Sequence, residues 1–547
     1  MKGVSMKNNG SFVTQAAILA GAGLFVRLLG FVSRLVMTNV LLGDLGNDIY
    51  GVAYIVYGFF FIVSSAGLPA AVSKMVAERY SVGRYAAAHR VFRVSMLFAC
   101  IMGVLCMALM LFCAAPVLSY INSPKSLLSV QVLVPSIMVV AVMAVFRGYF
   151  QGMGSTVPTA ISQVIEGVFN TIASIALAYL WMTSTGEGVD ALPYAAAGAS
   201  AGTTVSTVVG LLVMVWFYYM LKPRLLDNIK NAPKEKKKAD TGDLFKEITR
   251  ITFPIIAGTA IMSISNMIDT GMVKNLLEAA KVWTEEEINS MNGILQGKFF
   301  TITTLPVSIS TALATAVIPS IAASVVRKEK AVVRQKINMS LRIAMLISMP
   351  SAMGIGLLAD QILRMLFGAA PAGGGMLRVG ALSIVFLALT QILTGTLQGI
   401  GKVQIPMFGV LLGVLVKVIM NYFLISIPAV NVNGAVISTI ACYLVAGTFD
   451  WIMLTRLTKT KPDMVGILLK PAVAAVVMGM AVYVVYYLVY YILPSNTFAT
   501  LLAIVAGMGI YFGILLLIGG LKRGDIAMLP GGKKLAAALE RRGILKA

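Results

Sequence analysis

Long apolar runs recur along almost the whole of this chain, and they constrain its fold more than any other feature. Crossing the hydrocarbon core of a bilayer, about 30 Å thick, takes about 20 mostly apolar residues per helix. Only 12% of the 547 residues are charged and 58% are hydrophobic, whereas soluble domains carry about 25% charged residues. The sequence therefore predicts an all-α integral membrane protein, with no room for a large soluble domain.

The apolar runs predict fourteen membrane-spanning helices when they are followed in order. The first run is too long for a signal-peptide core and is not followed by a small-residue cleavage site, so we expect it to be retained. The predicted spans are residues 11–42, 49–77, 90–116, 127–152, 158–182, 191–221, 249–276, 288–326, 337–360, 376–400, 404–427, 431–456, 465–492 and 497–520.

The connections between these predicted helices alternate in charge. Those on one side are basic, as in residues 74–93, 222–250 and 327–336, and those on the other side are acidic or nearly uncharged, as in residues 43–48 and 278–290. Because Lys and Arg are enriched in cytoplasmic loops, both termini are predicted to be cytoplasmic. The net charge of +22 suits a face that attracts anionic lipid head groups and calls for no nucleic acid.

Two short motifs suggest that the chain contains an internal duplication. The stretch RGYFQGMGSTVP begins at Arg147, and TGTLQGIGKVQIP begins 247 residues later at Thr394. A weaker similarity near residues 70–96 and 315–345 has almost the same offset. Ordinary Gly and Pro turn chemistry is the alternative explanation.

If two six-helix halves are copies, each has an even number of spans, so both have the same orientation and are related by an axis along the membrane normal. The predicted domains are an N-lobe at residues 1–221, a basic cytoplasmic linker at 222–248, a C-lobe at 249–456, and two further helices with a basic cytoplasmic tail at 457–547.

Two arginines lie inside the first predicted span. No stretch of 20 residues within 11–42 avoids Arg27, and Arg34 lies seven residues further on, two helical turns away on the same face. A cation facing lipid costs about 2.5–3.5 kcal/mol or more. We therefore expect this face to line a polar cavity. The alternative, in which Arg27 reaches the inner head groups from a tilted helix, would require Arg34 to reach two turns further.

Other polar residues within the predicted spans are few. Gln163, Glu166 and Asn170 share one helical face, and Asp269 lies in the seventh span. We consider these four as candidates for a coupling site or for the cavity, with structural pairing between helices as the alternative. Arg147 lies at a predicted cytoplasmic helix end, where we expect it to contact lipid head groups.

The sequence contains no residue pattern that is typical of a soluble enzyme. The single histidine, His89, lies in a loop and the four cysteines lie in apolar helices, so no zinc ligand set is present in the sequence. No Walker motif occurs, and Thr284 with Glu287 is typical of a capping box that begins a helix. We expect no enzyme activity, no resident metal and no cofactor. Coupling to Na⁺, H⁺ or the membrane potential stays open.

The motifs VRLLGFVSRL and FRGYFQGMGSTVPTAISQVIEGVFN, within a chain of fourteen predicted helices, resemble the polysaccharide exporter family of the multidrug/oligosaccharidyl-lipid/polysaccharide flippase superfamily. Within it, the chain most resembles the branch of stage V sporulation protein B and the lipid II flippases, proteins of the bacterial cytoplasmic membrane. The resemblance covers essentially the whole chain, and its motifs specify the family rather than one substrate.

The resemblance implies two lobes around a cavity that opens alternately to each side. The cargo would be an undecaprenyl-pyrophosphate-linked saccharide, with the lipid II precursor of peptidoglycan as the first choice, and the transporter would function as a monomer among membrane lipids. The functional arginines of the family match Arg27 and Arg34, and an acidic residue after the first helix matches Asp48. An arginine of the eighth helix has Lys298 as its nearest counterpart, eight residues before Pro306.

Two other functions remain open at this stage. A multidrug exporter of the same fold would carry cations and would need acidic residues deep in a lobe, for which Glu166 and Asp269 are the candidates. A membrane polysaccharide polymerase would need a large external loop or a group of carboxylates at the outer surface, and the predicted external loops are short.

Overall fold

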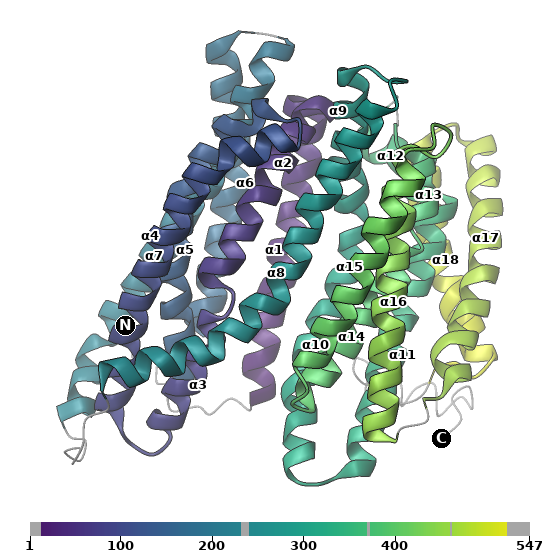
Figure 1. Ribbon diagram of the computed structural model, residues 1–547. Coiled ribbons are helices and arrows are strands. Elements are labelled where there is room, and N and C mark those ends of the chain that lie inside the picture. The colour runs from purple at the N-terminus through teal and green to yellow at the C-terminus, as the bar shows by residue number, and fades with distance from the viewer. Residues whose placement is uncertain (1–11, 187, 231–239, 369–371, 460–461, 522–547) are drawn as a thin grey trace. The chain divides into compact units, whose positions relative to one another are not determined.

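The computed structural model describes residues 12–186, 188–230, 240–368, 372–459 and 462–521 (Figure 1). Within these ranges all regular structure is helical and no strand is present. The predicted all-α class is therefore confirmed. Residues 231–239 of the predicted linker and 522–547 of the predicted tail lie outside the described residues.

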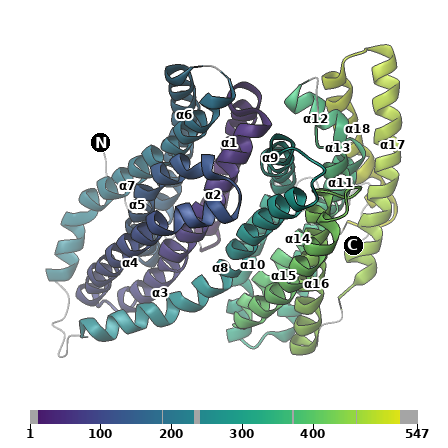
Figure 2. The same ribbon diagram turned by 45° about the horizontal axis from the view of Figure 1, so that its top comes forward.

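Contacts divide the chain into two units, Met1–Gly293 and Ile294–Ala547. Unit 1 holds α1 to α9, together with a π-helix, η1, and two short 3₁₀ helices, η2 and η3. Their bounds are α1 Phe12–Val36, η1 Met37–Leu42, α2 Gly43–Ser65, α3 Leu68–Tyr80, α4 Tyr85–Tyr120, η2 Pro124–Ser126, α5 Leu127–Gly152, α6 Val157–Thr185, η3 Val189–Ala191, α7 Leu192–Lys230, α8 Thr241–Ala279 and α9 Glu285–Ile294. In Figure 2 α5, α6 and α7 lie side by side, and α7 packs against both neighbours.

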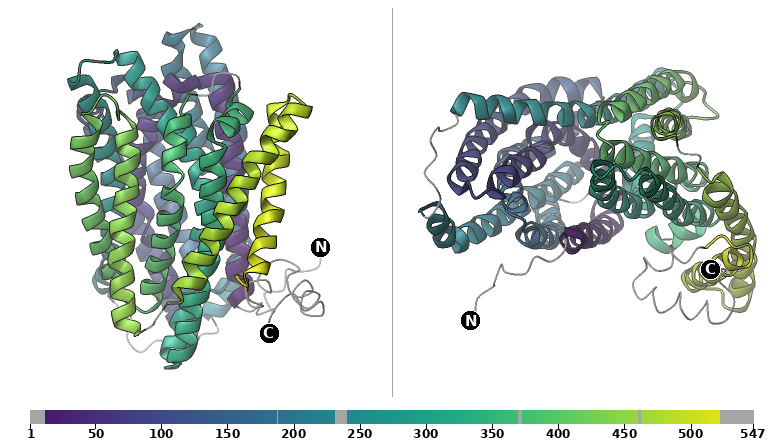
Figure 3. Two further views of the ribbon diagram at one scale, coloured as in Figure 1. Left: turned by 90° about the vertical axis from the view of Figure 1, so that its right-hand side faces the viewer. Right: turned by 90° about the horizontal axis from the view of Figure 1, so that it is seen from below.

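Unit 2 holds the remaining helices. Their bounds are the π-helix η4 Leu295–Phe299, α10 Phe300–Val326, α11 Lys330–Leu357, α12 Ala359–Phe367, α13 Gly374–Gly380, α14 Ser383–Gly399, α15 Gln404–Ile425, α16 Asn433–Thr458, the π-helix η5 Val465–Leu469, α17 Lys470–Ile492 and α18 Asn496–Leu517. The last two helices, yellow in Figure 3, pack against each other. The contact-based division falls at residue 293, and the lobe boundaries predicted at 222–248 stay a prediction.

Most of these helices are long and apolar enough to cross a membrane. Among the described residues, eleven helical stretches meet that condition, or twelve if the bent pair α13 and α14 forms one span. The continuous stretch Gly21–Tyr80 counts as one of them although it contains α1, η1, α2 and α3. The predicted count of fourteen is compatible with this arrangement. The chain is a multi-pass membrane protein, and large apolar side chains such as Phe112, 79% exposed, suit helix faces turned to lipid.

The two QGxG motifs have the same local structure in the two units. In unit 1, α5 ends at Gly152 and Gly154 has φ +85°; in unit 2, α14 ends at Gly399 and Gly401 has φ +86°. Both turns close with a hydrogen bond from the left-handed glycine N–H to the carbonyl of a glutamine three residues earlier, at 2.9 Å in each.

The helix that packs on the first motif also corresponds to the helix that packs on the second. A Cβ added to Gly152 would lie 2.8 Å from the carbonyl oxygen of Ser73, and one added to Gly399 would lie 2.9 Å from that of Ile318. Ser73 lies on α3 and Ile318 on α10, within the pair of regions whose weak similarity was noted in the sequence. This shared detail exceeds ordinary turn chemistry and supports the predicted duplication.

Candidate functional site

The two arginines of α1 lie in different surroundings. Arg27 is exposed and makes no hydrogen bond or ion pair among the described residues. Arg34 is half-buried, and its guanidinium carbon lies 4.6 Å from the centre of the Tyr50 ring on α2. A guanidinium stacked on an aromatic face keeps its hydrogen-bond donors directed outward around its edge. Unit 1 therefore carries two cationic groups that no carboxylate neutralises in the described residues.

A row of tyrosines on α2 continues from this cation–π contact. The ring centres of Tyr50 and Tyr54 lie 4.4 Å apart and those of Tyr54 and Tyr57 lie 5.8 Å apart. The hydroxyl of Tyr54 is hydrogen-bonded to that of Thr203 on α7. This row was not predicted from the sequence, although its spacing of four and three residues is typical of one helical face.

The first arginine helix ends in a π-helix, η1, three residues after Arg34. A second π-helix, η4, contains Lys298. Such local widening of a helix is rare and occurs frequently at functional sites. In unit 2, Lys298 is 5% exposed and its ammonium nitrogen lies 5.6 Å from the centre of the Phe367 ring.

Asp48 lies in a buried ion pair with Lys274 of α8, at an N–O distance of 2.6 Å. The two side chains are 2% and 1% exposed. Asn292 donates a hydrogen bond to the other carboxylate oxygen at 2.6 Å, and Lys274 also donates to Asn289 at 2.8 Å. Both charges are thus compensated within unit 1. Lys274 could not be identified from the sequence as the partner of Asp48, because 226 residues separate them.

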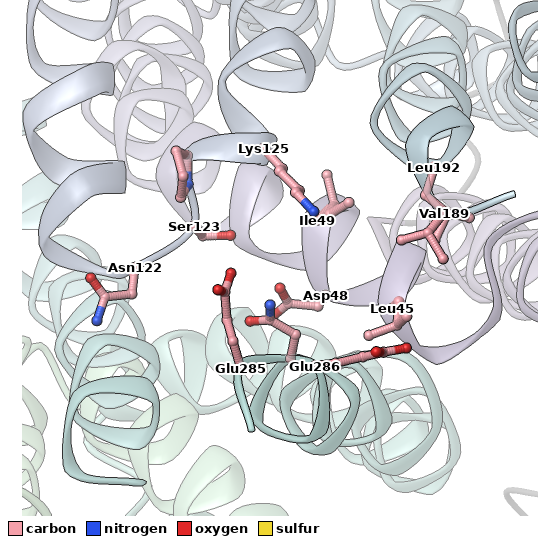
Figure 4. A pocket seen from close by; sticks show the side chains of 12 residues that line it. Leu45, Asp48, Ile49, Asn122, Ser123, Lys125, Val189, Leu192, Glu285 and Glu286 are labelled. Carbon is pink, nitrogen blue, oxygen red and sulfur yellow. The ribbon is translucent and has the colours of Figure 1, made fainter. Parts of the chain in front are cut away.

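Asp48 of this ion pair also lines a pocket of about 240 Å³ (Figure 4). Asp48 and Asn289 line it together with Lys125 and two acidic residues at the start of α9, Glu285 and Glu286. The pocket is therefore mixed in charge, with acidic groups in excess. It does not contain either arginine of α1.

Glu166 is paired with an arginine. Its carboxylate accepts a hydrogen bond from Arg147 at 2.6 Å, and Ser162 accepts a second one from the same guanidinium at 3.3 Å. The side chains of Arg147 and Glu166 are 17% and 22% exposed. α5 and α6 thus bring Arg147 against a carboxylate of unit 1, and its contact with lipid head groups stays a prediction.

The other polar candidates lie on α6 and α8. Asn170 donates hydrogen bonds to the hydroxyls of Thr203 and Ser206 on α7, so it connects two helices. The side-chain oxygen of Gln163 is buried without a hydrogen-bond partner in the described residues. Asp269, on α8, is 5% exposed.

The predicted capping box at the start of α9 is confirmed. The carboxylate of Glu287 accepts hydrogen bonds from the backbone N–H of Thr284 at 2.8 Å and from its hydroxyl at 3.0 Å. The N–H of Glu287 donates in return to the Thr284 hydroxyl at 3.3 Å. The N–H donor stabilises the charged form, so the pKa of Glu287 lies below its usual value.

Comparison with known proteins identifies the family of the chain. The model of the family described as "Polysaccharide biosynthesis protein" matches residues 12–325, more than half of the chain. The chain belongs to this family. A second model, MatE, matches residues 254–423. The resemblance stated from the helix motifs is thereby confirmed.

Three relatives from Bacillus subtilis (strain 168) extend the match. Stage V sporulation protein B is 27% identical, with 79% of this chain and 81% of the relative covered. The lipid II flippase MurJ is 24% identical over 79% of this chain and 82% of the relative. The uncharacterized membrane protein YabM is 24% identical over 96% of both chains.

Solved structures share the fold. The lipid II flippase MurJ in an inward closed conformation aligns with a TM-score of 0.65 at 14% identity, covering 92% of this chain and 98% of that one. An inward-facing multidrug resistance MATE family transporter of the MOP superfamily aligns with a TM-score of 0.64 at 17% identity, covering 82% and 100%. The chain thus has the fold of flippases and transporters of this superfamily.

Proposed function

We propose that this protein is a flippase that moves an undecaprenyl-pyrophosphate-linked saccharide from the inner to the outer leaflet of the bacterial cytoplasmic membrane. The first choice of cargo is the lipid II precursor of peptidoglycan, the substrate that the name of the relative MurJ states. The basic connections place both termini in the cytoplasm in this proposal. Transport would proceed by alternating access, with the chain acting as a monomer.

One observation carries the proposal: in unit 1 the uncompensated charges on α1 are positive. Arg27 has no acidic partner in the described residues and Arg34 is stacked on Tyr50. By contrast, Asp48 and Glu166 are each paired with a cation at 2.6 Å. A pyrophosphate crossing a low-dielectric layer needs groups that replace its hydration, and guanidinium groups do so with bidentate, charge-assisted hydrogen bonds.

Export of cations is the competing function, since MATE transporters share the fold. It would require carboxylates available to a cationic drug. Glu166, one of the two acidic candidates in the sequence, is engaged by Arg147, which also donates to Ser162. This pairing favours an anionic cargo.

The test is complementation of a bacterium depleted of its own lipid II flippase, beside a drug-resistance assay. Arg27→Ala and Arg34→Ala should each abolish complementation while the protein still inserts at normal levels, as checked by blot. The Lys variants keep the charge and lose the planar fork, so partial activity would indicate that charge dominates. Full complementation by the double Ala variant, or drug resistance that depends on Glu166 instead, would overturn the proposal.

A further inference from the structure

Unit 2 contains a buried carboxylate that none of the roles above uses. Asp450, on α16, is 0% exposed. Its Oδ2 accepts a hydrogen bond from the hydroxyl of Thr394 at 3.3 Å, which is long for an O–H donor. Its Oδ1 is buried with no hydrogen-bond partner in the described part of the chain. The carboxyl therefore has one weak neutral hydrogen-bond donor and no ion pair with a cation in the described residues.

The duplicated motif makes this environment informative. Thr394 begins the second QGxG motif at the position where Arg147 begins the first. In unit 1, that arginine compensates Glu166 at 2.6 Å. In unit 2 the same position offers only a hydroxyl to an acid that is more deeply buried. Glu166 in unit 1 is therefore part of an ion pair, whereas Asp450 in unit 2 is an isolated carboxyl.

Burial of an isolated carboxylate is expensive, costing several kcal/mol even after the protein relaxes. Such a group avoids that cost by binding a proton and becoming neutral. The charged groups on α13, α14 and α15, which pack against α16, do not change this balance. Arg378 of α13 is paired with Asp360 at 2.7 Å, and α14 has no charged residue. Lys417 of α15 lies eight residues, about 12 Å along the helix, from the glycine that faces Asp450.

That glycine, Gly409, also defines which ligand fits. A Cβ placed there would lie 2.7 Å from Oδ1 of Asp450 and 3.3 Å from the carbonyl oxygen of Ala446. The carboxyl is therefore pressed against bare backbone, which leaves no space beside Oδ1 for a metal cation and its several oxygen ligands. A proton needs no such space.

We propose that Asp450 is a proton-binding site of unit 2. It holds a proton on its carboxyl in the conformation described here, and releases that proton when a conformational change exposes it to water. Binding converts the carboxylate and one proton into a neutral carboxylic acid, with no other reactant. The consequence that transport is coupled to protons rests on the proposed flippase function, whereas the proton site itself does not.

Infrared spectroscopy of the purified full-length chain in lipid tests the site directly. A C=O stretch of a protonated carboxyl, shifted by D₂O and by ¹³C-labelled aspartate, is expected at neutral pH. It should disappear in Asp450→Asn and persist in the matched control Glu166→Gln, because that acid of unit 1 is held in an ion pair. Thr394→Arg, which supplies the cation found in unit 1, should also remove it.

Absence of a protonated aspartate band in the labelled wild-type chain would overturn the proposal without any variant. An unchanged band in folded Asp450→Asn would do so as well. The transport arm uses complementation, where Asp450→Asn should lose the dependence of export on the proton gradient. If Arg27→Ala and Arg34→Ala prove tolerated, the flippase function fails while the infrared result still decides the proton site.

Discussion

The buried ion pair between Asp48 and Lys274 allows a quantitative prediction. Replacing Lys274 by Met keeps most of the length of the side chain and removes the charge, which leaves Asp48 at 2% exposure without a cation and with Asn292 as its remaining hydrogen-bond donor. Removal of one partner from a buried pair costs about 3–5 kcal/mol, because the remaining group is buried without its compensating charge. We expect Lys274→Met to lower the free energy of unfolding by that amount.

An exposed ion pair in unit 2 supplies the matched control. Arg378 and Asp360 lie 2.7 Å apart, almost the same distance, but their side chains are 60% and 43% exposed. Exposed pairs contribute about 0–1 kcal/mol, so Arg378→Met should have little effect. Combining Lys274→Met with Asp48→Asn removes both charges and should recover most of the loss, because a neutral pair of similar volume avoids the desolvation cost.

The assay is unfolding of the purified protein in mixed detergent micelles with increasing SDS, followed by loss of helical circular dichroism. The four chains to be compared are the wild type, the two single Met variants and the double variant at positions 48 and 274. Equal losses of free energy for Lys274→Met and Arg378→Met would refute the reasoning, because burial would then have no influence on the strength of the pair.

Three further predictions concern topology, a helix cap and a helix contact. A cysteine at Glu286 should react with an impermeant maleimide in intact cells, and a cysteine at Arg84 should not. Both positions are exposed in the structure, but only the first is predicted to be external. Labelling at Arg84 would contradict the predicted orientation in the membrane. The lowered pKa of Glu287 means that the cap at α9 stabilises above the ordinary value of 4.5 and is lost as the pH falls through the lower folded value. Hydrogen exchange of the first α9 amides should show that loss, and Glu287→Gln should remove the pH dependence; an unchanged pH dependence in this variant would assign it to another group. Gly152→Ala should destabilise the protein by about 1–3 kcal/mol, because the added Cβ would lie 2.8 Å from the Ser73 carbonyl oxygen. The control Gly258→Ala, whose Cβ has nothing within 4 Å, should be neutral in the same SDS assay. Equal effects of the two variants would exclude the contact as the cause.

Several features could be predicted from the sequence because they depend on local patterns. The apolar runs determine that the chain is a helical membrane protein, since unpaired backbone groups cannot be left in lipid. The capping box at Thr284 and Glu287 is contained in four consecutive residues. The shared face of Arg27 and Arg34 follows from helical periodicity alone. The two QGxG turns were recognisable because their glycines must adopt the same left-handed conformation.

The charge partners were decided only by the tertiary structure. Helical periodicity states which residues share a face, but not which helix that face meets. Lys274 reaches Asp48 across 226 residues, and α6 brings Glu166 to Arg147. Asp450 was not singled out from the sequence, because nothing near it in the chain reveals that α14 brings a threonine and α15 a bare glycine against it. The packing of helices determines whether a buried acid lies next to a cation, an amide or no partner. The partner in turn determines which charges remain available for a ligand.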